Sequence, residues 1–465
     1  MALFKHQEEG IEWLKKRTHA ILADEMGLGK TRQAIIAAGD TSDETNLVIC
    51  PASLKLNWQR EIKAVYSDEE IVVVTGSNQD LPAEKPEWFR VAGWIIINYD
   101  ILGRNPWLGE MAQQGKIGSV IIDEAHYIKG KSERATEVLE LTKSIPIVYC
   151  LTGTPMLNRP AELFNLLKAV KHPLGKAKTV FAKRYCGGQM KALVRDLQAN
   201  KQFFVDPKRQ WPFRMQKDRY RVYVFMDDTG ATHLEELRRF TDDVMLRRTK
   251  KEVLDLPPKI VSDVMIELDS EQRSRYETAW DAYLEWIGAH PDASRNIDNI
   301  LTAQQLVEIG KLKQVCSLAK IARIVEDAEN AVEQGQKIII FSQYRQTISD
   351  LRVALAHLGV TTLTGDDDAE ARQEAVDAFQ TKDECKVFIA NIIAGGVGIN
   401  LTAASIVMFA DLDWSPGVNE QAEDRAHRIG QEGTVNVYRY IADETIESDI
   451  VRILAEKKHV ITDVI

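Results

Sequence analysis

Short runs of apolar residues alternate with helical patterns along the whole chain, and this alternation constrains the fold more than any other feature. The first half contains "NLVIC" (46–50) and "WIIINY" (94–99), and the second half contains "KIIIFSQY" (337–344) and "KVFIANI" (386–392). Apolar runs with few polar alternations are typical of strands buried on both faces, as in parallel sheets covered by helices. We therefore expect an α/β chain with two such sheets in tandem.

The length of 465 residues is large for one hydrophobic core and favours two domains. The stretch "LRRTKKEVLDLPPK" (246–259) interrupts the apolar pattern with charge and a Pro-Pro pair. We place the first lobe at residues 1–250 and the second at 251–465.

The five cysteines form no CxxC pair, which argues against a metal site or a disulfide framework and fits a reducing compartment. The stretch 387–410 has no charged residue over a length that could cross a membrane. It contains glycine and asparagine in its middle, so we interpret it as a buried strand, a glycine loop and a second buried strand. We expect no membrane association.

The stretch "HAILADEMGLGKT" (19–31) has the layout of a nucleotide-binding loop between a strand and a helix. Gly27 and Gly29 allow backbone N–H groups to turn toward phosphate oxygens. Lys30 can reach the β- and γ-phosphates, and Thr31 can bind Mg²⁺. A Walker A loop has glycine where Asp24 stands, so this stretch alone leaves a simple glycine turn open.

Two further stretches favour ATP hydrolysis. "SVIIDEAH" ends an apolar run with Asp123, a candidate Mg²⁺ holder, and with Glu124, which can orient or deprotonate water. "EQAEDRAHRIGQ" (420–431) has a helical pattern that puts Arg425 and Arg428 on one face. Such arginines can stabilise transition-state charge, but the spacing alone fits a solvated amphipathic helix as well.

Taken together, the motifs resemble those of the Snf-type (SWI/SNF-like) ATPases of helicase superfamily two. The matching stretches follow one another in the family's order and include "DEMGLGKT", "DEAH", "LTGTPMLNRPAELFNLL", "LRRTKKEVLDLPPK", "AGGVGINLTAAS" and "RAHRIGQ". In this family the phosphate loop begins with Asp, as it does here. The resemblance implies two RecA-like P-loop lobes with ATP and Mg²⁺ in the cleft between them.

The resemblance also assigns roles within the ATP site. Gln7 is similar to the family's adenine reader, and Gln421 matches a further position in the cleft. The resemblance puts the phosphates on Asp24, Gly27, Gly29, Lys30 and Thr31. It implies that Thr31 and Asp123 bind the metal and that Glu124 acts on the attacking water. Arg425 and Arg428 would then approach from the second lobe, with Arg428 as the arginine finger.

The resemblance implies translocation along double-stranded DNA, which remodels DNA structures or protein–DNA complexes without base specificity. Polar side chains and backbone N–H groups at strand ends can hold phosphates without reading bases. Trp414 matches a tryptophan that reaches DNA in the family, although the following Ser415 departs from the usual Asn, and core packing is the alternative. The candidate DNA contacts are Ser53, Lys55, Thr152, Gly153, Gln343, Tyr344, Gly396, Asn400 and Trp414.

A basic insertion around 188–228 departs from the common pattern. Residues 171–221 contain 14 Lys and Arg but 3 Asp and Glu, while the whole chain has a net charge of −10. Aromatic and basic residues interleave in "WPFRMQKDRYRVYVF" (211–225), a composition that suits base stacking and phosphate contact. We expect a β-hairpin that protrudes from lobe one and binds nucleic acid; a basic surface excursion that packs its aromatics inward is the alternative.

The expected partner is duplex or branched DNA, since the chain also resembles the subgroup that reanneals or remodels branched DNA. We expect a monomer, in the cytoplasm (nucleoid) of a prokaryote or virus or otherwise in the nucleus. A protein partner that supplies the target stays open. The alternatives are a DEAH-type RNA or DNA helicase and a DNA-binding clamp with an inactive ATP site.

Overall fold

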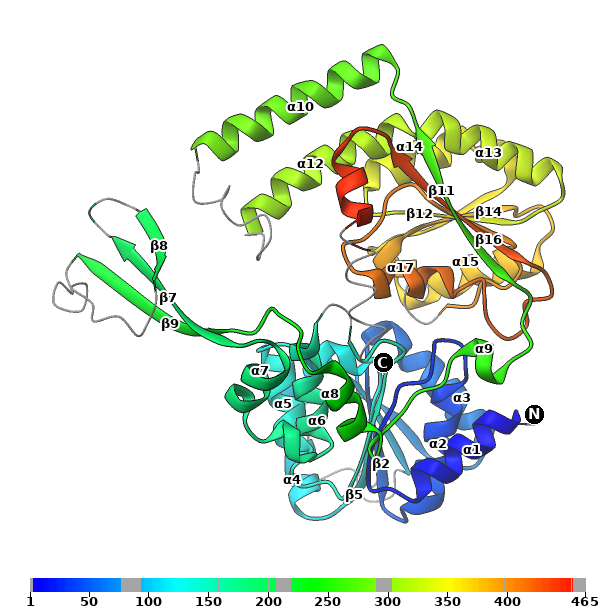
Figure 1. Ribbon diagram of the computed structural model, residues 1–465. Coiled ribbons are helices and arrows are strands. Elements are labelled where there is room, and N and C mark those ends of the chain that lie inside the picture. The colour runs from blue at the N-terminus through cyan, green and yellow to red at the C-terminus, as the bar shows by residue number, and fades with distance from the viewer. Residues whose placement is uncertain are drawn as a thin grey trace.

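Two parallel β-sheets, each covered by helices on both faces, form two lobes that lie one above the other in Figure 1. This arrangement confirms the predicted α/β class with two tandem lobes. The computed structural model describes residues 3–76, 93–156, 159–196, 198, 201–205, 219–289, 303–395, 399–452 and 454.

The first lobe contains a seven-stranded sheet in the order β10-β1-β6-β5-β2-β4-β3. Its strands are β1 His19–Leu22, β2 Thr45–Cys50, β3 Ile71–Val73, β4 Trp94–Asn98, β5 Ile117–Ile122, β6 Ile147–Leu151 and β10 Met245–Leu246. Its helices are α1 Lys5–Lys15, α2 Lys30–Thr41, α3 Lys55–Val65, α4 Trp107–Gln113, α5 Glu133–Leu141, α6 Leu163–Ala169, α7 Lys178–Tyr185 and α8 Leu234–Thr241.

The apolar runs form strands because both of their faces are buried. In β2, Leu47 and Ile49 belong to one core cluster, while Val48 and Cys50 belong to the cluster on the opposite face. Successive side chains of a strand point to opposite faces, so an uninterrupted apolar run fills two cores at once.

The second lobe contains a six-stranded parallel sheet in the order β11-β16-β15-β12-β14-β13. Its strands are β11 Lys259–Ile266, β12 Ile338–Ser342, β13 Val360–Leu363, β14 Val387–Asn391, β15 Ile406–Phe409 and β16 Val435–Ala442. Its helices are α10 Ser270–Ala289, α12 Ala303–Ala319, α13 Ile321–Glu333, α14 Arg345–Ala354, α15 Ala369–Thr381, α16 Ile392–Gly395 and α17 Pro416–Glu423.

The linker between the lobes follows β10, the outer strand of the first sheet, and ends at β11, the outer strand of the second. It contains the short helix α9 Lys250–Val253, which begins with a capping box between Thr249 and Glu252. The expected domain limit at residue 250 falls within this linker.

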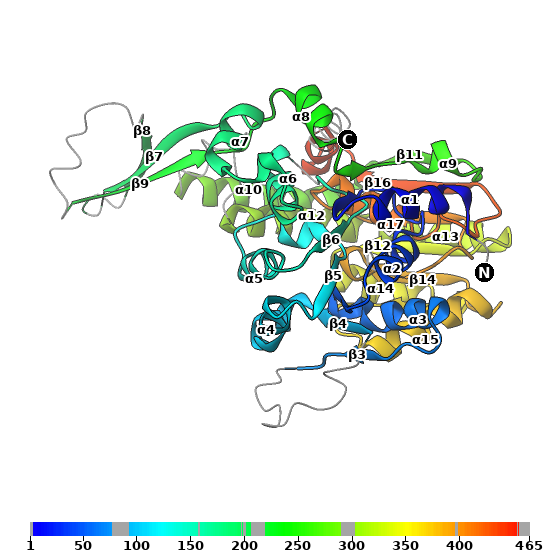
Figure 2. The same ribbon diagram turned by 90° about the horizontal axis from the view of Figure 1, so that it is seen from below.

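A third, antiparallel sheet in the order β8-β7-β9 extends from lobe one (Figures 1 and 2). Its strands are β7 Gln189–Asp196, β8 Lys201–Val205 and β9 Tyr220–Asp227. In both views it projects from the same side of the molecule as α10 and α12 of lobe two. We call this three-stranded sheet the arm.

The uncharged stretch 387–410 supplies two buried strands of lobe two, β14 and β15, as the sequence predicts. Within the described part of the chain, the search for a helix of sufficient length and apolarity to cross a bilayer returns none.

Candidate functional site

Two strands of the first sheet, β1 and β5, carry predicted ATP-site residues at their carboxyl ends, and β6 between them carries the predicted DNA contact Thr152. The loop 24–29 follows β1, Thr152 follows β6, and Asp123 follows β5. In parallel sheets ligands bind at this edge, because loops from adjacent strands converge there. The fold therefore brings these segments together although they lie up to about 130 residues apart.

The backbone of the phosphate loop adopts a conformation that depends on its two glycines. Gly27 and Gly29 have φ values of 86° and 74°, a region that other residues rarely adopt, and Gly29 caps the N-terminus of α2. Lys30 Nζ donates to the backbone oxygens of Asp24 (2.6 Å) and Glu25 (3.2 Å). Burial lowers the pKa of Lys30. A helix N-terminus with a buried lysine fits the phosphates of a nucleotide.

Gln7 lies against this loop, as the sequence predicts for an adenine reader. Its side-chain oxygen accepts a hydrogen bond from Phe4 N (3.1 Å), and its Nε2 is 3.5 Å from Leu28 O. A Cβ built on Gly29 would lie 2.1 Å from Gln7 Nε2. Any side chain at position 29 would therefore displace Gln7.

The carboxylate of Asp24 is fully buried and binds the linker. Arg248 donates from Nε to Asp24 Oδ1 (3.0 Å) and from Nη2 to Asp24 Oδ2 (2.5 Å), a bidentate pair. Asp24 thus contributes its backbone oxygen to Lys30 and its side chain to Arg248. Its predicted contact with nucleotide stays a prediction.

Asp123 and Glu124 lie at the end of β5, where Asp123 is buried and Glu124 is partly buried. Asp123 accepts hydrogen bonds from Trp58 Nε1 (2.7 Å) and from the backbone N of Glu124 (2.9 Å). Burial and the adjacent charge of Glu124 raise the pKa of Asp123 to about 7. Glu124 has a φ of 49°, the left-handed conformation that is uncommon outside glycine. Such backbone strain clusters at functional sites.

Glu124 is surrounded by positive groups. Burial alone would raise the pKa of its carboxyl, but His126, Lys30 and Arg425 outweigh burial and lower that pKa. The nearest contact is His126 Nδ1, 3.2 Å from Glu124 Oε2. The site therefore holds Glu124 as a carboxylate able to accept a proton from water.

Arg428 of lobe two lies against the phosphate loop of lobe one through its Cβ, while its guanidinium and that of Arg425 donate to Ile399 O (3.1 and 3.4 Å). A Cβ built on Gly27 would lie 2.9 Å from Arg428 Cβ, so the two lobes meet at this point. Burial, together with the neighbouring charge of Arg428, lowers the pKa of Arg425 to about 10. Gln421 crosses the cleft and donates to Thr154 Oγ1 (3.2 Å).

The predicted helix over 420–431 is wrong in its second half. Helix α17 ends at Glu423, and Arg425 and Arg428 lie in the turns that follow. The carbonyl of Arg425 accepts a hydrogen bond from Leu401 N (3.0 Å), which removes it from a helical ladder. The arginines come together through this tertiary contact rather than through helical spacing.

Lys250 of the linker joins the phosphate loop to the arginine segment. Its backbone N donates to Glu25 Oε2 (2.8 Å). Its Nζ lies 2.8 Å from Asp424 Oδ1 and also donates to the carbonyl of His427. Burial alone would raise the pKa of Asp424, but Lys259 and Lys250 lower it and keep the carboxylate charged.

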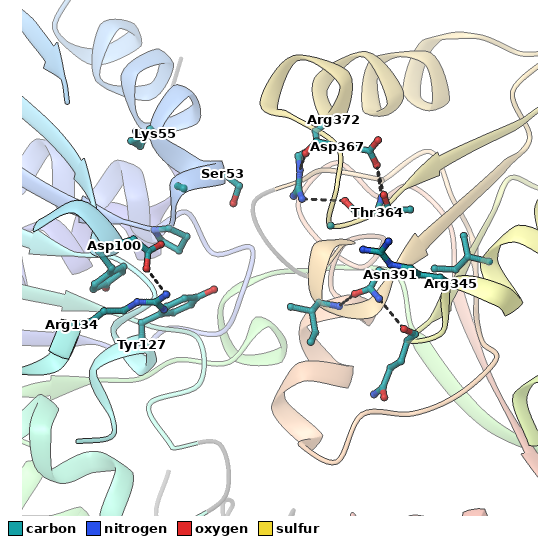
Figure 3. A pocket seen from close by; sticks show the side chains of 17 residues that line it. Ser53, Lys55, Asp100, Tyr127, Arg134, Arg345, Thr364, Asp367, Arg372 and Asn391 are labelled. Carbon is teal, nitrogen blue, oxygen red and sulfur yellow. Dashed lines mark hydrogen bonds and ion pairs between the residues drawn. The ribbon is translucent and has the colours of Figure 1, made fainter. Parts of the chain in front are cut away.

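A large groove lies between the lobes, with a volume of about 850 Å³ (Figure 3). Lobe one lines it with Ser53, Lys55 and Arg134, and lobe two faces them with Gln343 and other polar residues. Three predicted DNA contacts, Ser53, Lys55 and Gln343, therefore share one groove. The sequence analysis missed the groove-lining residues Tyr127, Arg134, Arg345, Thr364, Arg372 and Asn391.

The cationic side chains of the groove are held in place by local contacts. Lys55 Nζ donates to Val74 O (3.0 Å), and Arg372 donates to Asp367 O (3.0 Å) and Thr364 O (3.2 Å). Arg345 pairs with Asp366 (2.9 Å). For Arg345 and Arg372, only their arrangement in the fold, and no local sequence signal, distinguishes them from other surface arginines.

Other predicted DNA contacts lie outside this groove. Gly153 lies beside the phosphate loop, where a Cβ would be 3.4 Å from Lys30 Nζ, and Thr152 is buried next to it. Tyr344 donates its hydroxyl to Gly310 O (3.0 Å) on α12, and Trp414 packs in a cluster with α10 and α12.

The two remaining predictions concern the loop after β14. Asn400 is exposed, and Gly396 lies outside the described residues. Neither of these two residues is therefore assigned to the groove.

Two family models cover most of the chain. The SNF2-related domain matches residues 6–322, and the helicase conserved C-terminal domain matches residues 316–430. The chain belongs to the SNF2-related family.

Relatives of the chain include an uncharacterized ATP-dependent helicase of Mycoplasma genitalium, 31% identical over 99% of this chain and 42% of the relative. The human DNA annealing helicase and endonuclease ZRANB3 is 29% identical over 96% of this chain and 39% of the relative. The chain thus spans less than half the length of these two curated relatives. The solved Sulfolobus solfataricus SWI2/SNF2 ATPase core in complex with dsDNA is 26% identical over 100% of this chain and 93% of that chain, with a TM-score of 0.44.

Proposed function

We propose that the chain is an ATP-dependent translocase that moves along duplex DNA and remodels DNA structures or protein–DNA complexes. The observation that carries this proposal is that the two lobes meet at Gly27 and Arg428 and also form the groove between them. Because one lobe movement changes both places, ATP hydrolysis and the grip on a ligand in the groove are mechanically linked.

The hydrolytic step uses residues of both lobes. Glu124, held as a carboxylate, orients the attacking water and accepts its proton. Lys30 leaves the two backbone oxygens that it contacts and binds the β- and γ-phosphates. Arg428 enters from lobe two and stabilises the charge that develops on the transferred phosphoryl group, with Arg425 beside it.

The residues present also fit Mg²⁺. Thr31 lies in the first turn of α2, directly after Lys30, and Asp123 is a buried carboxylate at the end of β5, two strands from β1 in the sheet. No group of three or more His, Cys, Asp or Glu that could hold a metal occurs among the described residues. The hydroxyl of Thr31 and the carboxylate of Asp123 are oxygen ligands that suit a metal shared between the protein and ATP phosphates. When bound, Mg²⁺ neutralises charge on the phosphates.

The groove supports binding without base specificity. Hydroxyl, amide and cationic groups from both lobes line it and suit phosphate oxygens. The lining also contains apolar residues and two carboxylates, Asp100 and Asp367, which bind Arg134 and Thr364. We expect affinity for duplex DNA that falls with salt and depends little on sequence. The resemblance to a DNA annealing helicase makes branched DNA a substrate to include in the test.

Steady-state ATP hydrolysis with different nucleic acids tests the proposal. Blunt duplex DNA should stimulate turnover strongly, and single-stranded RNA should not. Translocation is measured by displacement of a third strand from a triplex. The variants Lys30→Ala and Glu124→Gln should lower turnover by about 10³-fold or more, since each removes a group that acts on the reacting phosphoryl or water.

The same assay decides between the alternatives. Stimulation by RNA instead of duplex DNA would indicate an RNA helicase. DNA binding without any turnover, in the wild type as in Lys30→Ala, would indicate an inactive clamp. Turnover without triplex displacement would contradict translocation.

A further inference from the structure

The arm is firmly attached to lobe one at its base. Arg184, at the end of α7, pairs with Glu236 of α8 (Nε to Oε1, 3.0 Å), and Tyr185 donates to the same carboxylate (3.0 Å). Gly187 N donates to Thr232 Oγ1 (3.2 Å) just before the first strand. These contacts flank both ends of the arm, so its orientation is set by helices of the lobe.

One face of the arm combines aromatic and basic side chains with one carboxylate, Asp227, which pairs with Lys191 (2.5 Å). Arg221, Tyr223 and Phe225 alternate along β9 and therefore point to one side. Tyr223 and Phe225 are 51% and 37% exposed, and their Cα atoms are about 7 Å apart. Lys191 lies directly opposite Phe225 on β7, so it shares this face. We call Arg221, Tyr223, Phe225 and Lys191 the stacking face.

The opposite face differs in chemistry. Ala192 and Val194 of β7 are fully buried there. Met190 and Val224 on the same side are 43% and 46% exposed, and neither carries a charge. A protein partner would use this apolar side, whereas a polyanion would use the stacking face.

The positive net charge of the region around the arm favours a polyanion as its ligand. Residues 171–221 carry 14 Lys and Arg against 3 Asp and Glu, in a chain whose net charge is −10. Aromatic rings accept unpaired bases by stacking, and flanking cations contact phosphates; this combination is typical of single-strand binding. Bases inside an intact duplex are not open to such rings.

We propose that the stacking face of the arm is a second nucleic-acid site, which binds single-stranded DNA. No residue of the arm lines the groove between the lobes. The inference rests on the proposed function, because it gives DNA as the substrate. It deepens that function: the motor holds duplex DNA in the groove and an unpaired strand on the arm.

Binding of a fluorescent oligothymidylate of 20 nucleotides tests the proposal. The double variant Tyr223→Ser, Phe225→Ser should weaken binding by at least ten-fold. Both side chains are substantially exposed, so folding should persist. The matched control Met190→Ser, Val224→Ser changes two exposed residues on the opposite face and should bind within two-fold of the wild type.

In Arg221→Gln, the salt slope of log affinity should fall by about 0.7.

ATP hydrolysis with blunt duplex DNA separates this inference from the proposed function. The stacking-face variant should keep wild-type duplex-stimulated turnover within two-fold. If its affinity for oligothymidylate equals that of the wild type, or if the control variant loses as much, the arm is not a single-strand site. If duplex DNA fails to stimulate the wild type, the proposed function fails instead.

Discussion

Arg248 holds three parts of lobe one through a single side chain. Its guanidinium binds both carboxylate oxygens of Asp24, the amide oxygen of Gln33 (2.9 Å) and the carbonyl of His6. These partners lie in the phosphate loop, in α2 behind it, and in α1 beside Gln7. Arg248 thus fixes the position of the loop against both helices, and the Asp in place of the first Walker glycine provides the anchor.

Arg248→Met should lower the free energy of unfolding of lobe one by about 3 kcal/mol, because it leaves the carboxylate of Asp24 buried without its partner. Urea unfolding measures the change. The double variant Asp24→Asn, Arg248→Met removes the buried charge and should recover part of the loss. Arg239→Met, on the exposed side of α8, is the control and should change stability by less than about 0.5 kcal/mol. Equal effects of Arg248→Met and Arg239→Met would contradict this role.

At the scale of elements, the linker is part of the active site as well as a connection. Arg247 donates to the backbone oxygen of Ala23 (3.1 Å), just before the phosphate loop, and to that of Gly153 (3.2 Å), in the loop after β6. Lys250 then reaches the arginine segment of lobe two at Asp424. Lys250 therefore connects the phosphate loop to the segment that carries Arg428.

Lys250→Met should lower kcat by about 10²-fold with little change in KM for ATP. Loss of its contact with Asp424 and His427 misplaces Arg428, and a displacement of about 1 Å has effects of that size. Lys251→Met changes the exposed neighbour and should leave kcat unchanged. Lys250→Arg should retain part of the activity. A parallel loss in both methionine variants, or a change in KM alone, would argue against positioning through Lys250.

Some elements follow directly from sequence, and others need the fold. The run Ile95, Ile96 and Ile97 predicts a buried strand, because each of these apolar side chains is more stable away from water. These residues lie in β4 and are buried. The end of α17 at Glu423 depends on Leu401, a residue more than twenty positions away. Long-range hydrogen bonds of this kind leave no trace in local periodicity.

The same distinction applies to the site. Gly29, Lys30 and Asp123 carry their chemistry in short motifs, so the sequence identifies them. Arg134 and Arg372 resemble many surface arginines in sequence, and only the approach of the two lobes puts them in one groove. Composition predicted a basic β-hairpin at the arm, but the structure has a three-stranded sheet there, and its stacking face required the register of β7 and β9.

At the scale of the whole molecule, the two lobes meet in two places that respond to one movement. Gln421 and Arg428 contact lobe one at the ATP cleft, while the polar residues of α14 and α15 face Lys55 across the groove. In the proposed motor, opening the cleft would withdraw the arginines and change the groove in the same step. This coupling is the physical basis of the proposed motor.

Turnover and nucleotide binding of Arg428→Ala, measured with saturating duplex DNA, test the joint active site most directly. We expect ATP affinity within a few-fold of the wild type and a turnover at least 10³-fold lower, because the arginine acts on the transition state. Arg352→Ala, exposed on α14 of the same lobe, should behave as the wild type. Turnover of Arg428→Ala within ten-fold of the wild type would show that lobe one hydrolyses ATP alone, and would contradict the account.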